Sequence, residues 1–334
     1  MYRFLGLLLA VVAAPLGACE PSDDSCVTAR DGVCDEPQLC AYGSDSSDCD
    51  AACVVQDPSA EPACAHDEAL RNLADETWSA TSVTGAATRG TWDGVIEARS
   101  ASIGSTSDRH FRVHVPASYR PDQPMPLLFV LGGFQVDLYF LPGYTELDRS
   151  SELSDVIVVY LQPEWRDFGS YWVFAWYVYE NAWEGGWEDN PDLDFMSKLI
   201  DHMSKHYNID DRRMFVSGHS RGAALSVIAT FERPDLFAGF CAQSGFLTNN
   251  NYDDRILELG DRPARGGYII HGDADPDVPV SESDALADTL LEVGWLEDED
   301  FEYRRLEEVT HFWQPQYNEM FLRFLNDHPL PEDE

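Results

Sequence analysis

Short apolar runs alternate with amphipathic stretches along most of the chain beyond residue 90. Apolar runs of four to eight residues bounded by Gly, Pro or Asp are typical of buried strands, and apolar residues spaced three and four apart are typical of helices. The expected strands are 92–98, 126–131, 156–161, 214–216, 238–242, 268–270 and 301–306, and the expected helices are 192–206 and 223–231. This alternation predicts an α/β fold, a mostly parallel sheet with helices on both faces.

One junction between an expected strand and an expected helix carries chemistry. The motif Gly218-His219-Ser220-Arg221-Gly222 joins the strand that ends at Val216 to the following helix. This strand–turn–helix setting is the one in which a G-x-S-x-G nucleophile elbow works, because the sharp turn holds the serine hydroxyl above the sheet. The flanking glycines leave room where a Cβ would collide. The alternative is that Ser220 is an ordinary helix N-cap.

Candidate acids and a candidate base follow the next strands. Asp273, Asp275 and Asp277 lie in the loop after strand 268–270, and His311 follows strand 301–306. The carboxyl end of a parallel sheet is where sites form. The chain order Ser, Asp, His is the order of α/β-hydrolases. His311 would take the proton of the serine and an aspartate would orient the imidazole, while His219 and His271 are expected to be scaffold.

The oxyanion hole is expected to use two backbone N–H groups. One belongs to Arg221, the residue after the nucleophile, and the other to Gly133 in the Gly132-Gly133 pair after strand 126–131. Glycine allows the backbone to approach a developing oxyanion closely. The alternative is that the pair only makes a tight turn.

An ordered set of motifs between about Arg109 and Pro315 resembles the poly(3-hydroxybutyrate) depolymerase and feruloyl esterase family of the α/β-hydrolase superfamily. The matching stretches are Phe111-Arg112-Val113-His114-Val115-Pro116 with Tyr119, then Pro126-Leu127-Leu128, Asp194-Phe195, Tyr207-Asn208-Ile209-Asp210 with Arg213, Glu232-Arg233-Pro234-Asp235-Leu236-Phe237, His271-Gly272-x-x-Asp275-x-x-Val278-Pro279, and His311-x-Trp313. The resemblance implies that Asp275 is the catalytic acid. It also implies a serine carboxylic-ester hydrolase that forms an acyl-enzyme, with no cofactor for catalysis.

Three positions depart from the family pattern. Leu131 replaces the histidine usual at the oxyanion loop, Arg221 replaces the frequent asparagine, and Thr310 replaces the glycine before the base. None of these changes removes a catalytic group, but all are expected at the mouth of the cleft. The resemblance implies small or polymeric ester substrates, either feruloyl or acetyl polysaccharide esters or hydroxyalkanoate polyesters. The alternatives are a serine peptidase of the same fold and a catalytically silent surface binding protein.

An aromatic insert between residues 165 and 187 holds five tryptophans, three tyrosines and two phenylalanines. Its position at the carboxyl edge of the sheet allows two interpretations, a platform for substrate or a plug of aromatic side chains that pack on one another. Trp172 and Trp176, four residues apart, would share a helical face and contact substrate. Trp313, next to His311, is predicted to form the wall of the site.

Charge narrows the class of partner. The 334 residues carry a formal net charge of −38 and include only two lysines, Lys198 and Lys205. Such acidity argues against a nucleic-acid partner, because phosphates would be repelled. No pattern indicates an oligomeric state, and no apolar run reaches the roughly 18 residues of a membrane-spanning helix.

The first residues read as an export signal. An apolar stretch follows Arg3 and ends in Leu16-Gly17-Ala18-Cys19, which resembles a bacterial lipobox. The resemblance implies a signal peptide over residues 1–18 and lipidation of Cys19, with anchoring at the cell envelope and the outer membrane favoured by Glu20. The alternative is a protein cut after Ala18 and secreted.

Six further cysteines crowd the segment after the predicted cleavage site, at positions 26, 34, 40, 49, 53 and 64. In an exported chain such an even cluster predicts disulfides, whereas Cys241 in an apolar run is expected to be buried. Interleaved aspartates resemble small extracellular calcium modules, and structural Ca²⁺ would be held by Asp31, Asp35, Asp45 and Asp48. The alternative is a solvated acidic stalk. The predicted organisation is therefore 1–18 signal peptide, 19–66 cysteine-rich module, 67–108 linker with strands, and 109–330 catalytic domain.

Overall fold

The structure is a computed structural model that describes residues 89–101, 104–167, 172–179, 183, 185–248, 251–260, 262–263 and 266–332. Its strands are β1 (Gly90–Ser100), β2 (Ser105–Val115), β3 (Met125–Leu131), β4 (Ile157–Leu161), β5 (Trp165–Asp167), β6 (Trp172–Phe174), β7 (Ile209–His219), β8 (Gly239–Gln243), β9 (Gly266–Gly272) and β10 (Phe301–Leu306). Its α-helices are α3 (Leu141–Thr145), α4 (Leu147–Ser154), α5 (Pro191–His206), α6 (Arg221–Glu232), α7 (Tyr252–Leu259), α8 (Ser281–Glu292) and α9 (Asn318–Asn326).

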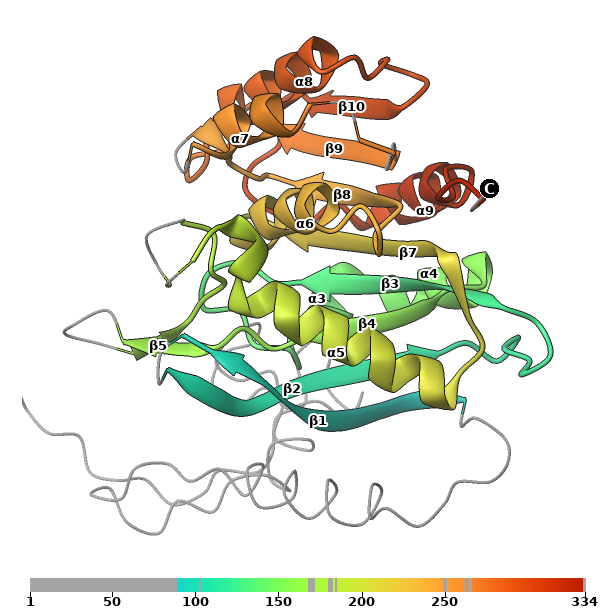
Figure 1. The fold of residues 1–334 in the computed structure, drawn as a ribbon. Helices are drawn as coiled ribbons and strands as arrows, with labels where there is room; N and C mark the ends of the chain where they lie inside the picture. The colour runs from blue at the N-terminus through green and yellow to red at the C-terminus, as the bar shows by residue number, and fades with distance from the viewer. Residues whose placement is uncertain are drawn as a thin grey trace, which may run out of the picture. The chain divides into compact units, whose positions relative to one another are not determined.

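Eight strands form one sheet in the order β1-β2-β4-β3-β7-β8-β9-β10. The hairpin of β1 and β2 is antiparallel, β2 pairs antiparallel with β4, and all remaining pairs are parallel. The carboxyl ends of β3, β7, β8, β9 and β10 therefore lie along one edge, on the left in Figure 1. The predicted class, an α/β fold with a mostly parallel sheet, is confirmed.

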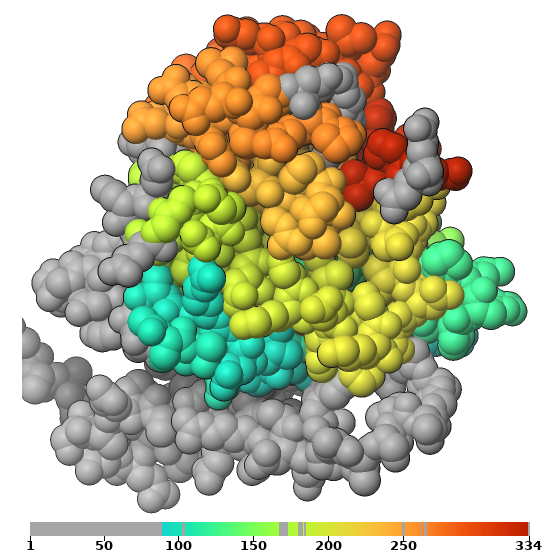
Figure 2. Space-filling model, viewed as in Figure 1, coloured from blue at the N-terminus to red at the C-terminus, as the bar shows by residue number. Residues whose placement is uncertain are grey.

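Helices bury both faces of the sheet. Along β3, Leu127 and Phe129 pack in the core shared with α5, α6, α7 and α8, while Leu128 and Val130 pack in the core shared with α4 and α9. Because successive strand residues point to opposite faces, a strand covered on both sides must be apolar throughout, which is why these runs were recognisable. Seen from the face of the sheet that α5 to α8 cover, the residues of these helices occupy the surface in front of the strands (Figure 2).

The expected strands and helices agree with the structure to within two residues at each end, except for the extent of β7 and for the helical spacing of Trp172 and Trp176. We expected 214–216, whereas β7 begins at Ile209 and continues to His219. The added first residues are polar and only partly buried, and the register shifts between Met125 and Leu127, so this half of the strand lacks the apolar pattern of a buried one. Among the described residues, no helix has the length and apolarity needed to cross a membrane.

Candidate active site

Ser220 is the single residue between β7 and α6. Its backbone has φ 55° and ψ −118°, a conformation that non-glycine residues rarely adopt. The side chain makes no N-cap hydrogen bond, and the amide of Ser220 donates to the carbonyl of Gln243 at 2.8 Å. Ser220 is therefore not an ordinary N-cap. The strained turn is the geometry expected of a nucleophile elbow.

The two elbow glycines allow α6 to touch the loop after β3. A Cβ on Gly222 would lie 2.2 Å from the carbonyl oxygen of Leu131 and 2.5 Å from that of Gly132, and a Cβ on Gly218 would lie 2.2 Å from the backbone of Gly222. All these partners are backbone atoms, so only glycine fits. The same approach puts Gly133 against the elbow, because its hypothetical Cβ would lie 3.3 Å from Cβ of Ser220.

The amides of Gly133 and Arg221 remain available beside the serine. Neither donates a backbone hydrogen bond to any described residue. The loop itself is held by Trp176, whose indole Nε1–H donates to the carbonyl of Gly132 at 2.8 Å. Two unused N–H groups on either side of a serine are what an oxyanion hole requires.

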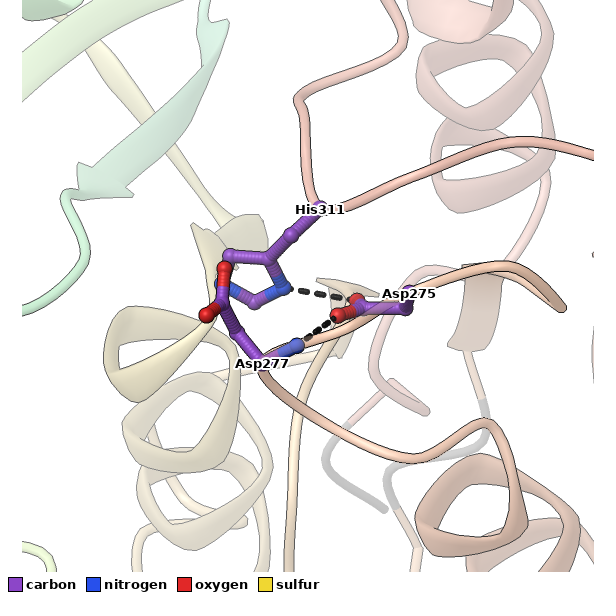
Figure 3. A group of neighbouring side chains, drawn as sticks. All are labelled: Asp275, Asp277 and His311. Atoms are coloured by element: carbon purple, nitrogen blue, oxygen red, sulfur yellow. Dashed lines mark hydrogen bonds and ion pairs between the residues drawn. The ribbon is translucent and has the colours of Figure 1, made fainter.

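His311 and Asp275 form a hydrogen-bonded pair at the ends of neighbouring parallel strands. Nδ1 of His311, after β10, lies 2.6 Å from Oδ2 of Asp275, after β9 (Figure 3). The other oxygen, Oδ1, accepts the amides of Asp277 and Val278, each at 2.9 Å. Burial acts to raise the pKa of Asp275, but these backbone amides and His311 outweigh it and hold the pKa below its usual value. The carboxylate is thus ionised at neutral pH.

Two further histidines surround this pair. His271 lies with Nε2 3.2 Å from Oδ2 of Asp275, and its Nδ1 contacts the Ser283 hydroxyl at 2.7 Å. The ring of His219 lies 4.6 Å from that of His311. Burial, with the nearby His311, lowers the pKa of His219 to about 3, so this ring is neutral. Both histidines are packed in the scaffold, as expected.

The contact between His219 and His311 brings the base to the elbow, because His219 directly precedes Ser220. No hydrogen bond joins the Ser220 hydroxyl to His311 among the described residues. In an enzyme without substrate such a bond is often long and tightens only in the complex. The ring contact therefore brings an imidazole that is bonded to Asp275 next to the residue that precedes Ser220.

The other two loop aspartates have different surroundings. Asp273 accepts the amide of Glu308 at 2.8 Å, so it fastens the loop to the turn after β10. Asp277 is exposed, and its carboxylate lies with Asp275 and His311 so that one ligand atom from each falls within 4.8 Å of the others (Figure 3). These are donors that a metal could use. Both oxygens of Asp275 already accept hydrogen bonds, however, so a metal would have to displace the bond to His311.

Trp172 and Trp176 do not share a helical face, so that prediction was wrong. Trp172 begins the short strand β6, which pairs antiparallel with β5, and no helix covers 175–179. Trp176 is fully buried and bonded to Gly132. It holds the Gly132-Gly133 loop and presents no exposed face. Among the aromatic side chains of the insert that the structure describes, Trp165 is the exposed one, at 51%, and it packs on Phe174.

Trp313 is not a wall of the site either. Its side chain is 3% exposed, packs edge-on against Phe321 of α9 and donates to Asn318 at 3.0 Å. The residue next to His311 in sequence thus points into the core shared with α9. The exposed aromatic next to the base is Phe312 instead, at 63%.

Two polar residues that the sequence reasoning missed hold the loop of His311. The amide of Trp313 donates to the Tyr144 hydroxyl at 2.7 Å, and the amide of Gln314 donates to the side chain of Gln243 at 2.8 Å. Burial raises the pKa of Tyr144 to about 12, so it remains a neutral phenol. Gln243 could have been noticed, because it is the one polar residue of the buried strand β8.

We expect Trp176→Phe to lower kcat for a neutral ester by about 10- to 100-fold with little change in KM, since a small displacement of an oxyanion donor is costly. Kinetics with p-nitrophenyl acetate would measure this. Trp295→Phe is the matched control, because Trp295 is also buried but its Nε1 has no partner. Equal losses in both variants would contradict a specific role for Trp176.

Several sequence predictions fall on residues 1–88, outside the described residues. They are the signal peptide, lipidation of Cys19, the disulfides, and calcium ligation by Asp31, Asp35, Asp45 and Asp48, and they stay predictions. Cys241 is described and is a fully buried free thiol in β8. Burial raises the pKa of this thiol well above its usual value, so it is not an activated nucleophile.

Comparison with known proteins places most of the chain in one family. Residues 100–322 match the model of the Esterase family, described as "Putative esterase". The chain is 26% identical over 137 residues to the bifunctional acetylxylan esterase/xylanase XynS20E of Neocallimastix patriciarum. It is 24% identical over 241 residues to the "Putative esterase NocK" of Nocardia uniformis subsp. tsuyamanensis. These matches cover 41% and 72% of this chain but only 18% and 64% of the two relatives.

Solved structures agree on the fold. A ferulic acid esterase superposes with a TM-score of 0.53 at 13% identity, covering 72% of this chain and 99% of that one. An S-formylglutathione hydrolase from Agrobacterium tumefaciens gives a TM-score of 0.52 at 14% identity, with 74% and 98% covered. At such identities the likeness shows the architecture alone, an α/β-hydrolase-like fold.

Proposed function

We propose that this chain, which belongs to the Esterase family of the α/β-hydrolase superfamily, hydrolyses carboxylic esters through a serine acyl-enzyme. The observation that carries the proposal is the position of one imidazole. His311 is hydrogen-bonded to Asp275 through Nδ1 and packs against His219, the residue that precedes the strained Ser220. These contacts support the assignment of Ser220 as nucleophile, His311 as base and Asp275 as orienting acid.

In the proposed reaction the Ser220 oxygen attacks the ester carbonyl carbon while Nε2 of His311 takes the hydroxyl proton. The negative charge that develops on the carbonyl oxygen is held by the amides of Gly133 and Arg221. The C–O bond to the alcohol then breaks, and His311 protonates the departing oxygen. A water molecule, deprotonated by His311, attacks the acyl-enzyme and releases the acid and Ser220.

Ionised Asp275 performs two tasks in this scheme. It keeps the proton of neutral His311 on Nδ1, so that Nε2 faces the serine with a lone pair. It also stabilises the imidazolium that forms. These steps use only groups of the chain and a water molecule.

The substrate class is proposed from the names of relatives. They include an acetylxylan esterase and a ferulic acid esterase, and acetyl and feruloyl esters of polysaccharides are therefore the first candidates, with hydroxyalkanoate polyesters as a further one. A panel of these three ester types would rank them.

Labelling with a fluorophosphonate probe tests the proposal on the intact protein. We expect one covalent adduct, which peptide mass spectrometry should find on Ser220, because an activated serine attacks the phosphorus. Hydrolysis of p-nitrophenyl acetate should be much faster than that of the matching amide, p-nitroacetanilide. An unlabelled, folded protein would favour a binding protein, and comparable rates on ester and amide would favour a peptidase.

A further inference from the structure

The side chain of Arg221 is a buried cation that has no ion-pair partner among the described residues. It is 9% exposed, and its Nε donates to the carbonyl of Trp176 at 3.0 Å. No described carboxylate lies within ion-pair distance of it, in contrast to buried Arg109, which pairs with Asp192 at 2.7 Å. Neither Nη group of Arg221 has a hydrogen bond to a described residue. Among the described residues, neither Nη atom belongs to the polar atoms that are fully buried without a hydrogen-bond partner. Two donors of the guanidinium therefore stay open to a ligand.

A second guanidinium lies at the same carbonyl. Nη1 of Arg166 donates to the oxygen of Trp176 at 3.1 Å, so two cations converge on one acceptor. Burial and the charge of Arg166 lower the pKa of Arg221 to about 10, which still leaves it charged at neutral pH.

The position of this cation relates it to the reaction. Arg221 directly follows Ser220, and its guanidinium carbon lies 5.7 Å from the ring centre of Phe134 and 5.2 Å from that of Tyr179. Phe134 follows Gly133 in the oxyanion loop and is 41% exposed. The guanidinium thus lies between the oxyanion loop and the aromatic insert.

Burying a cation is costly unless an opposite charge compensates it, and buried charges in proteins are normally paired. Among the described residues, the groups in contact with the guanidinium are neutral, one carbonyl and two aromatic faces, while the carboxylate of Asp192 is paired with Arg109 and acts on Arg221 only from beyond ion-pair distance. The missing partner can come from the ligand, because a guanidinium with both Nη groups open matches the two oxygens of a carboxylate.

We propose that Arg221 binds a carboxylate of the substrate, so that the esters cleaved at Ser220 are anionic ones that carry an acid group beside the scissile bond. The proposal rests on the proposed function and deepens it, since it concerns the substrate class of the same site. It assigns the Arg221 side chain to specificity, apart from the role of its amide in the oxyanion hole.

Matched ester pairs test the proposal. On the acyl side they are mono-p-nitrophenyl adipate and its neutral methyl ester, and on the alcohol side 3-acetoxybenzoate and its methyl ester. We expect the wild type to have the higher kcat/KM for the acid in one of the two pairs. Arg221→Met should lower the ratio of kcat/KM for that acid to kcat/KM for its neutral ester by about 10- to 100-fold, as expected for loss of a charge-assisted hydrogen bond. Arg221→Lys should retain part of the preference.

Arg120→Met is the matched control, because it removes the same charge from an exposed residue paired with Asp122. Arg120→Met should leave the ratio of kcat/KM for the acid to kcat/KM for the neutral ester unchanged. If it changed this ratio as much as Arg221→Met does, the effect would be one of net charge, and the proposal would be overturned. Equal losses on acid and neutral ester in Arg221→Met, or a wild type without preference, would overturn it as well. Neutral ester hydrolysis by the wild type in those cases would leave the esterase function standing, while the absence of any turnover would reject that function instead.

Discussion

Ser220→Ala should lower kcat for p-nitrophenyl acetate by about 10⁴- to 10⁶-fold, the range seen when a serine nucleophile is removed. The reason is that no other described hydroxyl lies on a strained elbow beside unused amides. The free energy of unfolding should change by less than about 1 kcal/mol, because the Ser220 hydroxyl makes no hydrogen bond that the variant would lose. Initial-rate kinetics, thermal unfolding and probe labelling would measure the three effects.

Ser226→Ala is a suitable control for that experiment. Ser226 lies in α6, the helix that follows Ser220, and is buried, and its hydroxyl donates to the carbonyl of Ala223 at 2.7 Å. This variant should lose some stability and keep its activity. A Ser220→Ala protein that retained more than a small fraction of wild-type turnover would exclude Ser220 as the nucleophile, and labelling elsewhere would then identify the actual one.

The candidate site could be located from the sequence because its residues follow recognisable strands. The strand before Asp275 is a buried apolar run, whereas the partly buried strand before His311 alternates apolar and polar residues. Because β9 and β10 pair in parallel, the loops that follow them meet. Gly218 and Gly222 likewise indicate the elbow in the sequence, because the backbone contacts at these two positions exclude any side chain. Local pattern and sheet geometry were sufficient to place these loops, whereas the choice of Asp275 over Asp273 and Asp277 came from the family resemblance.

The aromatic residues could not be assigned in the same way. Trp172 and Trp176 have helical spacing, yet β6 pairs with β5, and spacing alone does not exclude a strand followed by a loop. The role of Trp176 depends on a hydrogen bond to Gly132, 44 residues away in sequence, which no local pattern encodes. Trp313 misled because proximity in sequence to His311 does not decide which core a side chain enters.

The lack of a described ion-pair partner for Arg221 could not be predicted from the sequence either. Its sequence position suggested only a backbone amide for the oxyanion hole. Whether a buried arginine has a counter-ion depends on residues distant in sequence. Here the guanidinium meets the carbonyl of Trp176, which Arg166 shares, and no described carboxylate lies within ion-pair distance. Only the folded arrangement turns this departure from the family pattern into a hypothesis about substrate.

Asp275→Asn should lower kcat/KM by about 10⁴-fold at pH 7, the size of effect known for an acid that sets the tautomer of a catalytic histidine. The amides of Asp277 and Val278 both point at Oδ1, so the carbonyl oxygen of the new asparagine should take that position. Its NH₂ group would then face Nδ1 of His311 and favour the tautomer with the proton on Nε2. That tautomer cannot accept the serine proton.

The pKa of Asp275 predicts how this effect depends on pH. Because the folded protein holds that pKa below its usual value, the wild type keeps the carboxylate at pH 5 as well as at pH 8. Protonation of Asp275 should therefore not narrow the gap between wild type and variant over this range. Rate profiles of both proteins between pH 5 and pH 8 would test this.

Asp273→Asn and Asp277→Asn separate the orienting acid from its two neighbours. Asp273 fastens the loop and Asp277 is exposed, so each variant should keep activity within about threefold of wild type, as for most surface substitutions. If Asp277→Asn were as damaging as Asp275→Asn, and a chelator abolished wild-type activity, the three side chains of Figure 3 would be metal ligands and the imidazole would not be a base. Full activity in Asp275→Asn would instead move the orienting role to another carboxylate.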